Sequence, residues 1–425
     1  MKEKVILTIR EQQRLKVLNE VMTGGLSGGT AAEAMGISLR HERRLLAAYR
    51  KKGVEALAHG NRGRLPANTL PDSIKRQVKL LARSPYSGFN TQHFTELLAE
   101  KEGIQLSRSS VHRILLSAGI SSPRKRRLPK HRSRRERYPE EGMLLQIDGS
   151  PHDWLEGRGP EFSLIGAIDD ATGKVPYALF REQEDTIGYF ILLREIVGRY
   201  GLPLALYHDR HSIFEVSSDK LPSPEVQLSD KRPLTQFGRL LAELGITSIP
   251  ALSPQAKGRI ERLWGTFQDR LVSELRLAGV STLEEANRFL EVFLSRYNAR
   301  FAVAAARAGL AYRNAEGIGL ERIFCLKYKR IVGADNVVRF NRHRLQVLPS
   351  MERLSYARCL VEVHQQLDGS LRVYYQGQYL DTSSAPAEAT KMRELVGAAT
   401  GSARGASYHV ARPAKDHPWR QWVYR

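Results

Sequence analysis

Cysteines are scarce in this chain, and long apolar runs are missing. Only Cys325 and Cys359 occur among its 425 residues, too few for a disulfide scaffold or a thiolate zinc site. No stretch approaches the roughly 18 uncharged apolar residues that a membrane-spanning helix needs, and residues 1–4 do not begin a signal-peptide core. The composition is otherwise that of a globular protein, with length for about three domains. We therefore expect neither a secreted, nor a membrane, nor a zinc-finger protein.

Positive charge is concentrated in the first third of the chain. Residues 1–140 contain 29 lysines and arginines against 12 acidic residues, a net charge of +17, whereas the rest of the chain carries only +4. This asymmetry is expected if the first third contacts a polyanion, and a merely soluble basic surface would not need it. The charge therefore predicts a nucleic-acid partner.

The first 62 residues have the pattern of a helix-turn-helix module. Apolar residues recur at helical spacing over 10–22, and a glycine-rich break follows. A short helix over 30–35, a turn at Gly36-Ile37 and a helix over 39–50 capped by Ser38 complete the motif, whose second helix enters the major groove. The side chains expected to face DNA are Arg40, His41, Arg43 and Arg44.

The same pattern recurs over 63–120. Helices are expected over 71–82 and 91–101, with a turn at Gly103-Ile104 and a second recognition helix over 107–118. Ordinary packing of helical hairpins is the alternative for either module, but two in tandem on a basic segment favour DNA binding. The expected DNA contacts of this module are Arg108 and Arg113.

A strongly basic linker over 121–139 follows the two modules. Nine basic residues lie between positions 124 and 137, opposed only by Glu136. Such a run repels itself into an extended solvated segment, and we expect this one to contact phosphates as well. The contacts predicted at its start are Arg124, Lys125, Arg126 and Arg127.

The middle of the chain predicts an α/β sandwich with carboxylates at its strand ends. An apolar run over 143–147 ends at Asp148, and a strand over 204–207 ends at His208-Asp209. Between them we expect a hairpin (162–169 and 175–180) and a helix (185–200). Alternating strands and helices after a hairpin are typical of a layered α/β core rather than an eight-unit barrel.

A third carboxylate lies at the start of a long amphipathic helix. Its apolar residues, from Ile260 to Leu275, are three or four positions apart, and Glu261 lies off that face. Glu261 shares a stripe with Lys257 and Gly265, an arrangement that leaves room for a phosphate backbone and a charge to hold it. A solvent-exposed helix face is the alternative for these residues.

Three segments resemble the blocks of a DDE transposase with a retroviral-integrase-type core. They are Gln146-Ile147-Asp148-Gly149-Ser150, Tyr207-His208-Asp209-Arg210-His211-Ser212-Ile213-Phe214 and Ser253-Pro254-Gln255-Ala256-Lys257-Gly258-Arg259-Ile260-Glu261-Arg262. The whole chain most resembles bacterial insertion-sequence transposases of the ISNCY group. The resemblance covers the helix-turn-helix region, the core and the C-terminal part.

The resemblance implies an RNase H-like fold with Asp148, Asp209 and Glu261 as a metal-binding catalytic triad. Such carboxylates hold two Mg²⁺ ions, for which Mn²⁺ can substitute, and the ions stabilise the entering and leaving oxygens of a phosphodiester displacement. The nucleophile is first water and then the freed 3′-hydroxyl. One departure is the 51-residue gap between Asp209 and Glu261, which an inserted loop over 215–233 explains.

Other polar residues near these blocks have structural alternatives. Asp169 and Asp170 are interpreted as turn residues, and Asp153 either assists the site or caps a loop. The pair His208 and His211 lacks partners for a zinc site and is interpreted as local hydrogen bonders or DNA contacts. At the helix start, Lys257 and Arg259 are predicted to contact phosphate, with a solvated helix N-terminus as the alternative.

The C-terminal third has a β pattern over 320–382 and a tail over 383–425. Short strands, with a hairpin turn at Asp368-Gly369, predict a small β-barrel that in related transposases helps to bind DNA and organise the multimer. The tail is rich in small residues and ends in an aromatic cluster that we expect to dock on DNA or another protomer: Trp419, Trp422 and Tyr424.

The leading hypothesis is a Mg²⁺-dependent transposase of a bacterial insertion sequence. It would bind terminal inverted repeats and target DNA as a homo-multimer, at least a dimer, in the nucleoid-associated cytoplasm, without a membrane. The alternatives are a catalytically silent repressor derived from a transposase and an RNase H-like nuclease that does not join DNA. The expected domains are helix-turn-helix modules at 1–62 and 63–120, a linker at 121–139, a core at 140–305, a barrel at 320–382 and a tail at 383–425.

Overall fold

The computed structural model describes residues 6–58, 61, 69–123, 136–216, 233–251 and 257–385. The chain divides into two compact units, one formed by Met1–Ser84 and Thr95–Ser121, the other by Pro85–Phe94 and Ser122–Arg425. The predicted linker contacts Arg124, Lys125, Arg126 and Arg127, most of the predicted insertion and the aromatic tail lie outside the described residues. No helix within the described ranges combines the length and hydropathy needed to cross a membrane.

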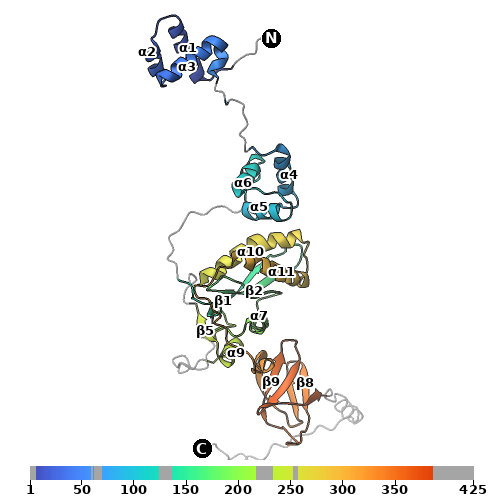
Figure 1. The fold of residues 1–425 in the computed structure, drawn as a ribbon. Coiled ribbons are helices and arrows are strands. Elements are labelled where there is room, and N and C mark those ends of the chain that lie inside the picture. The colour runs from blue at the N-terminus through green and yellow to red at the C-terminus, as the bar shows by residue number, and fades with distance from the viewer. Residues whose placement is uncertain are drawn as a thin grey trace, which may run out of the picture. The chain divides into compact units, whose positions relative to one another are not determined.

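The first helical module has the predicted helix-turn-helix order (Figure 1). Ser38 caps the last α-helix by accepting a hydrogen bond from the His41 amide. Gly36 adopts a φ of +61°, which lets the chain turn sharply before that helix. The elements are α1 (Ile9–Met22), α2 (Gly28–Ala34), α3 (Leu39–Lys52) and the 3₁₀ helix η1 (Gly53–Leu57).

Three further helices follow the predicted second module: α4 (Asp72–Arg83), α5 (Thr91–Glu100) and α6 (Arg108–Ser117). Ser107 caps α6 by accepting from the Ser110 amide, and Gly103 has a φ of +67° in the preceding turn. Both modules thus use the same local chemistry, a left-handed glycine followed by a serine cap.

The core contains a five-stranded sheet of order β3-β2-β1-β4-β5. The first three strands are antiparallel neighbours, whereas β4 pairs in parallel with both β1 and β5. This mixed sheet confirms the predicted α/β core that begins with a hairpin. The strands are β1 (Leu144–His152), β2 (Phe162–Asp169), β3 (Ala178–Arg181), β4 (Ala205–His208) and β5 (Thr247–Pro250).

Helices cover both faces of this sheet (Figure 1). On one face, Leu145 and Ile147 of β1 pack with the buried side chains of α7 (Thr186–Tyr200) and α9 (Gln236–Leu244). On the other, β2 packs against α10 (Gly258–Leu277) and α11 (Leu283–Phe301). Because successive strand residues face opposite sides, Gln146 and Asp148 point toward α10.

The C-terminal strands form two sheets, so the predicted closed barrel is wrong. The three strands of the smaller sheet are only three to five residues long and pair with one another, so the hydrogen bonding does not continue into the larger sheet. One apolar cluster, with Val338, Val363 and Val373 at its centre, fills the space between the sheets. The larger sheet is β6 (Cys325–Ile331), β9 (Leu360–Gln366), β10 (Leu371–Tyr375) and β11 (Gln378–Leu380); the smaller is β7 (Val337–Phe340), β8 (His343–Val347) and β12 (Thr382–Ser384).

Strand β6 is docked on helix α9 of the core. The Gln236 side chain donates to the Lys327 carbonyl over 2.6 Å and accepts from the Lys327 amide over 3.0 Å. Arg239 donates to the Cys325 carbonyl, and Lys327 bonds both carboxylate oxygens of Glu243. After the short helix α12 (Leu320–Ile323), the chain is therefore fixed to the core where the larger sheet begins.

Candidate active site

The candidate site lies where β4 ends beside the middle of β1, which continues to His152. Asp148 is in β1, and Asp209 immediately follows β4. The register pairs Gln146 with Tyr207, so the two aspartates lie two residues further along adjacent strands. Carboxyl ends of parallel strands are where α/β sheets place their ligands.

Lys257, just before α10, lies between the two aspartates. Its Nζ is 2.6 Å from Asp148 Oδ1 and 3.7 Å from Asp209 Oδ2. The second oxygen of Asp148 accepts a 3.0 Å hydrogen bond from the indole Nε1 of Trp264. Asp209 Oδ1 accepts from the backbone amide of His211 over 3.0 Å. The two carboxylates are thus oriented by separate donors and share one positive charge.

The three charged side chains differ in their contact with solvent. Lys257 is 9% exposed, Asp148 20% and Asp209 45%. A nearly buried ammonium is stable only beside acceptors that compensate for its lost hydration. The acid pair supplies that compensation, and the open side of the cluster is at Asp209.

Glu261, the third predicted ligand, is not brought to this pair. It lies in α10 one helical turn after Lys257, and it is exposed. In the described part of the chain, no group of three His, Cys, Asp or Glu side chains is close enough to hold a metal ion. The structure therefore joins Asp148 with Asp209 and leaves Glu261 on the neighbouring helix surface.

Arg259, predicted to contact phosphate, instead forms an ion pair with Asp170. Its Nε is 2.7 Å from Asp170 Oδ1, and that fully buried carboxylate also accepts from Gln146 and from the Tyr138 amide. The structural interpretation of Asp170 is confirmed by these bonds. A phosphate contact by Arg259 is not tested, and its guanidinium, 14% exposed, is engaged in the core.

Asp169 also has a structural role, as predicted. It accepts from the Gly142 amide and from both the amide and the hydroxyl of Thr172. Burial raises the pKa of Asp169 despite these hydrogen bonds. The carboxyl therefore fixes the turn after β2 and is closed to solvent.

The histidines near the second block differ in environment. His208 is buried, with Nδ1 2.6 Å from the Asp209 carbonyl oxygen and Nε2 2.7 Å from Ser248 Oγ. Burial lowers the pKa of His208, which favours the neutral ring. This confirms its interpretation as a local hydrogen bonder, whereas the exposed His211 orients Asp209 through its backbone.

Sequence reasoning missed the role of Trp264. Its position on the apolar face of the helix predicted only packing, and its ring is indeed buried with Phe267. A buried indole needs a partner for its N–H. Trp264 lies seven residues, two helical turns, after Lys257 and so on the same side of α10, and this spacing is the signal that could have placed its N–H near Asp148.

The predicted DNA-contacting residues of the helical modules lie on helix surfaces. Arg40, Arg43 and Arg44 of α3 are exposed, and His41 is half-buried. In α6 the side chains of Arg108 and Arg113 are exposed as well. Their contact with DNA stays a prediction.

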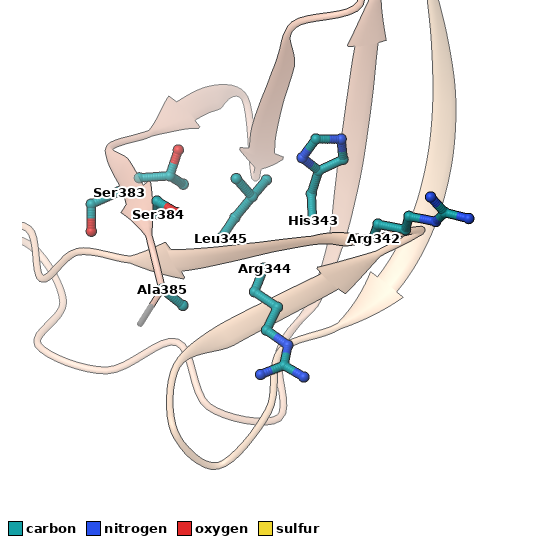
Figure 2. Close-up of a pocket in the computed structure, with 8 residues that line it drawn as sticks. Arg342, His343, Arg344, Leu345, Ser383, Ser384 and Ala385 are labelled. Carbon is teal, nitrogen blue, oxygen red and sulfur yellow. The ribbon is translucent and has the colours of Figure 1, made fainter. Parts of the chain in front are cut away.

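A concave feature lies on the smaller C-terminal sheet. A pocket of about 570 Å³ is bordered by the start of β8 and by β12. Figure 2 shows Arg342, His343 and Arg344 on one side of it, and Ser383, Ser384 and Ala385 on the other. None of the residues predicted for catalysis lines this pocket.

Comparison with known proteins identifies transposases as relatives. The helix-turn-helix domain family matches residues 13–65. The chain is 36% identical over 380 residues to y4bF of Sinorhizobium fredii (strain NBRC 101917 / NGR234), a protein assigned as a transposase, covering 88% of this chain and 81% of that protein. It is 35% identical over 328 residues to the transposase for insertion sequence IS1202 of Streptococcus pneumoniae, covering 69% of each.

Solved structures are more distant. A simian T-cell lymphotropic virus intasome in complex with the PP2A regulatory subunit B56 gamma matches with a TM-score of 0.31 and 14% identity, over 73% of this chain and 99% of that one. The HTLV-2 integrase catalytic core with magnesium, in its dimeric form, matches with a TM-score of 0.28 and 15% identity, over 39% and 92%. Similarity this low carries no argument, so the assignment rests on the two sequence relatives. On their identity and coverage, the chain belongs to the transposase family that includes y4bF and the IS1202 transposase.

Proposed function

We propose that the chain is the transposase of a bacterial insertion sequence, binding the terminal inverted repeats of its element and catalysing metal-dependent strand cleavage and strand transfer. The observation that carries the catalytic part is the pair Asp148 and Asp209, which share one cationic group where β4 ends beside the middle of β1. The relatives support the transposase activity itself.

The acid pair fits a divalent metal. Carboxylate oxygens are the hard ligands that Mg²⁺ and Mn²⁺ prefer, and the nearby ammonium of Lys257 shows that the pair accommodates a cation. Asp148, Asp209 and Glu261 would hold two Mg²⁺ ions, which when bound stabilise the charge on the attacking and leaving oxygens. Mn²⁺ would substitute for Mg²⁺.

The protein's own contribution is positioning. Trp264 fixes the orientation of Asp148, and the His211 amide fixes that of Asp209. Ligands held in place by hydrogen-bonded neighbours keep a metal site in its reactive geometry. Glu261 would supply the third carboxylate from α10.

DNA binding is assigned to the basic N-terminal third. The helix α3 would enter the major groove of the terminal repeat, and α6 would make the corresponding contact in the second module. The linker basic residues would track phosphates between the modules and the core. We infer a homo-multimer, at least a dimer, that holds paired transposon ends and target DNA in the nucleoid-associated cytoplasm.

Strand transfer in vitro tests this function. Labelled DNA with the ends of the element that encodes the protein is incubated with the full chain and Mg²⁺, beside Asp148→Asn and Glu261→Gln. Glu291→Gln, which changes an exposed acid of α11, is the matched control. We expect joined products from the native protein and the control, and none from the other two variants.

Two results would overturn the proposal. Specific binding of the ends without cleavage in Mg²⁺ or Mn²⁺ would indicate a repressor that has lost catalysis. Cleavage that never leads to joined products would indicate a nuclease, because joining requires the freed 3′-hydroxyl to attack a second DNA.

A further inference from the structure

The ammonium of Lys257 lies between the two aspartates that would bind the metal ion in the proposed site. Its ammonium is nearly buried and is within 4 Å of one oxygen from each aspartate. Lysines are rarely buried unless paired, because their hydration is costly to lose. Its position just before the first residue of α10 brings it to the middle of β1 and the end of β4.

The ammonium and a metal ion need the same oxygens. Asp148 Oδ1 is 2.6 Å from Lys257, and Asp148 Oδ2 is already bonded to the Trp264 indole. An ion binding to Asp148 and Asp209 would meet the ammonium charge at short range, where repulsion between cations is strong. Metal and ammonium therefore exclude each other at this pair.

The ammonium also stabilises the two carboxylates when no metal is bound. Two carboxylates that face one another repel and raise each other's cost of ionisation. A lysine between them balances that charge, and its flexible four-carbon stem allows it to leave. Arg259, the next basic residue in the chain, cannot take this role because Asp170 holds its guanidinium.

We propose that Lys257 is an internal counterion that occupies the Asp148–Asp209 pair before metal binding and is exchanged for the divalent cation. The inference rests on the proposed function, since it assumes that this pair is part of the metal site. The ammonium of Lys257 and the divalent cation then compete for the carboxylates of Asp148 and Asp209. Loss of the ammonium therefore tightens metal binding.

The test measures metal affinity without DNA or catalysis. Binding of Mn²⁺ to the full chain is followed by electron paramagnetic resonance of the free ion, for the native protein and Lys257→Met, which keeps the length of the side chain without its charge. The matched control is Lys174→Met, because Lys174 forms a similar part-buried ion pair with Glu141 over 2.9 Å, in which neither Asp148 nor Asp209 takes part. A variant Lys257→Gln provides a polar replacement if the methionine variant fails to fold.

We expect Lys257→Met or Lys257→Gln to bind Mn²⁺ about tenfold or more tightly than the native protein, which corresponds to the loss of one charge-assisted contact. Lys174→Met should bind as the native protein does. Equal or weaker Mn²⁺ binding by folded Lys257 variants overturns the counterion role. In that case, if Asp148→Asn abolishes Mn²⁺ binding, the proposed metal site is still supported. If Asp148→Asn leaves Mn²⁺ binding intact, or none of the proteins binds, the proposed metal site itself fails.

Discussion

At the residue scale, two aspartates of the core show how environment separates a structural carboxylate from one proposed to bind metal. Asp170 is fully buried and receives bonds from Arg259, Gln146 and a backbone amide. Asp148 keeps 20% of its side chain exposed and is bonded by Lys257 and Trp264. Of the two carboxylates, only that of Asp148 keeps part of its surface open to solvent.

The indole of Trp264 gives a prediction about orientation. In Trp264→Phe the aromatic packing remains but the donor to Asp148 Oδ2 is lost, so the carboxylate is no longer fixed. We expect the rate of DNA cleavage to fall by about 10- to 100-fold, as for other residues that support metal ligands. Rates on labelled transposon ends measure this effect.

Trp154→Phe is the matched control. Trp154 is also fully buried, but its indole donates to the Ser150 carbonyl rather than to a carboxylate. Similar rate losses in both variants would show that general packing, not the bond to Asp148, explains the effect.

The buried ion pair of Arg259 gives a prediction about stability. Asp170→Asn would leave the guanidinium without its charge partner, and breaking such a pair costs roughly 3–5 kcal/mol. We expect a clearly lower melting temperature for Asp170→Asn and for Arg259→Gln. The exposed neighbour Arg262 serves as control, since Arg262→Gln should melt as the native protein does.

Calorimetric melting of the three variants checks this. A native melting temperature in Arg259→Gln, together with a loss of DNA affinity, would contradict the structural role and favour the phosphate contact predicted from sequence.

The same residues show what sequence patterns can and cannot predict. Asp148 and Asp209 were predicted because each follows an apolar run in the sequence, and strand register brings them together, although β1 continues past Asp148 to His152. The partners of Lys257 and Arg259 were not predictable, since they depend on where the start of α10 meets β1 in space. Glu261 illustrates the converse, because its place in the triad follows from resemblance and no contact in the described structure fixes it.

At the scale of elements, helices and strands with clear periodicity were predicted close to their observed bounds. The serine caps and left-handed glycines of α3 and α6 are local features, so sequence alone reveals them. Barrel closure depends on hydrogen bonds between distant strands, and the short β7, β8 and β12 pair only among themselves. Strand content was therefore predictable, whereas sheet closure was not.

The contact between α9 and β6 predicts a dependence on pH. Burial alone would raise the pKa of Glu243, but hydrogen bonds and charges from Lys327 and Arg239 outweigh it and lower that pKa below its usual 4.5. A carboxyl with a lowered folded pKa stabilises the fold above its unfolded pKa and loses that effect as pH falls through the folded one. We expect this contribution, about 1 kcal/mol for a part-exposed cluster, to be present above pH 4.5 and to disappear below it.

The measurement is urea unfolding between pH 3 and 7 for the native protein and Glu243→Gln. The free-energy difference between them should be largest near neutral pH and shrink in acid. A difference that stays constant across this range would contradict the ion-pair account.

The exposed face of α3 gives a prediction about DNA. Arg44→Gln removes one exposed charge from the predicted recognition helix, so affinity for the terminal repeat should fall. If Arg44 contacts a phosphate, the slope of log affinity against log salt should decrease by about one, with a uniform loss across sequences. Fluorescence anisotropy at several salt concentrations measures both quantities.

Lys16→Gln is the control for this measurement. Lys16 is exposed on α1, which is not the recognition helix. Equal losses of affinity in the two variants would show that overall charge, rather than α3, determines binding.

At the scale of the whole molecule, the positive charge and the proposed catalytic site lie in different parts of the chain. The net +17 of residues 1–140 accompanies the two helical modules, while the acid pair and its helix lie in the nearly neutral remainder. This separation suits a protein whose N-terminal part holds DNA by its phosphates and whose core acts on one bond. The clustering of positive charge could be predicted from composition alone, because it can be counted along the chain without knowing the fold.

A change of metal preference at Asp148 tests the central claim, metal-dependent cleavage at this acid pair, most directly. In Asp148→Cys a softer thiolate replaces the carboxylate, and soft ligands disfavour Mg²⁺ more than Mn²⁺. We predict that Asp148→Cys cleaves transposon ends in Mn²⁺ but not in Mg²⁺, while the native protein cleaves in both. Cleavage by Asp148→Cys in Mg²⁺ at the native rate would contradict direct contact between Asp148 and the metal.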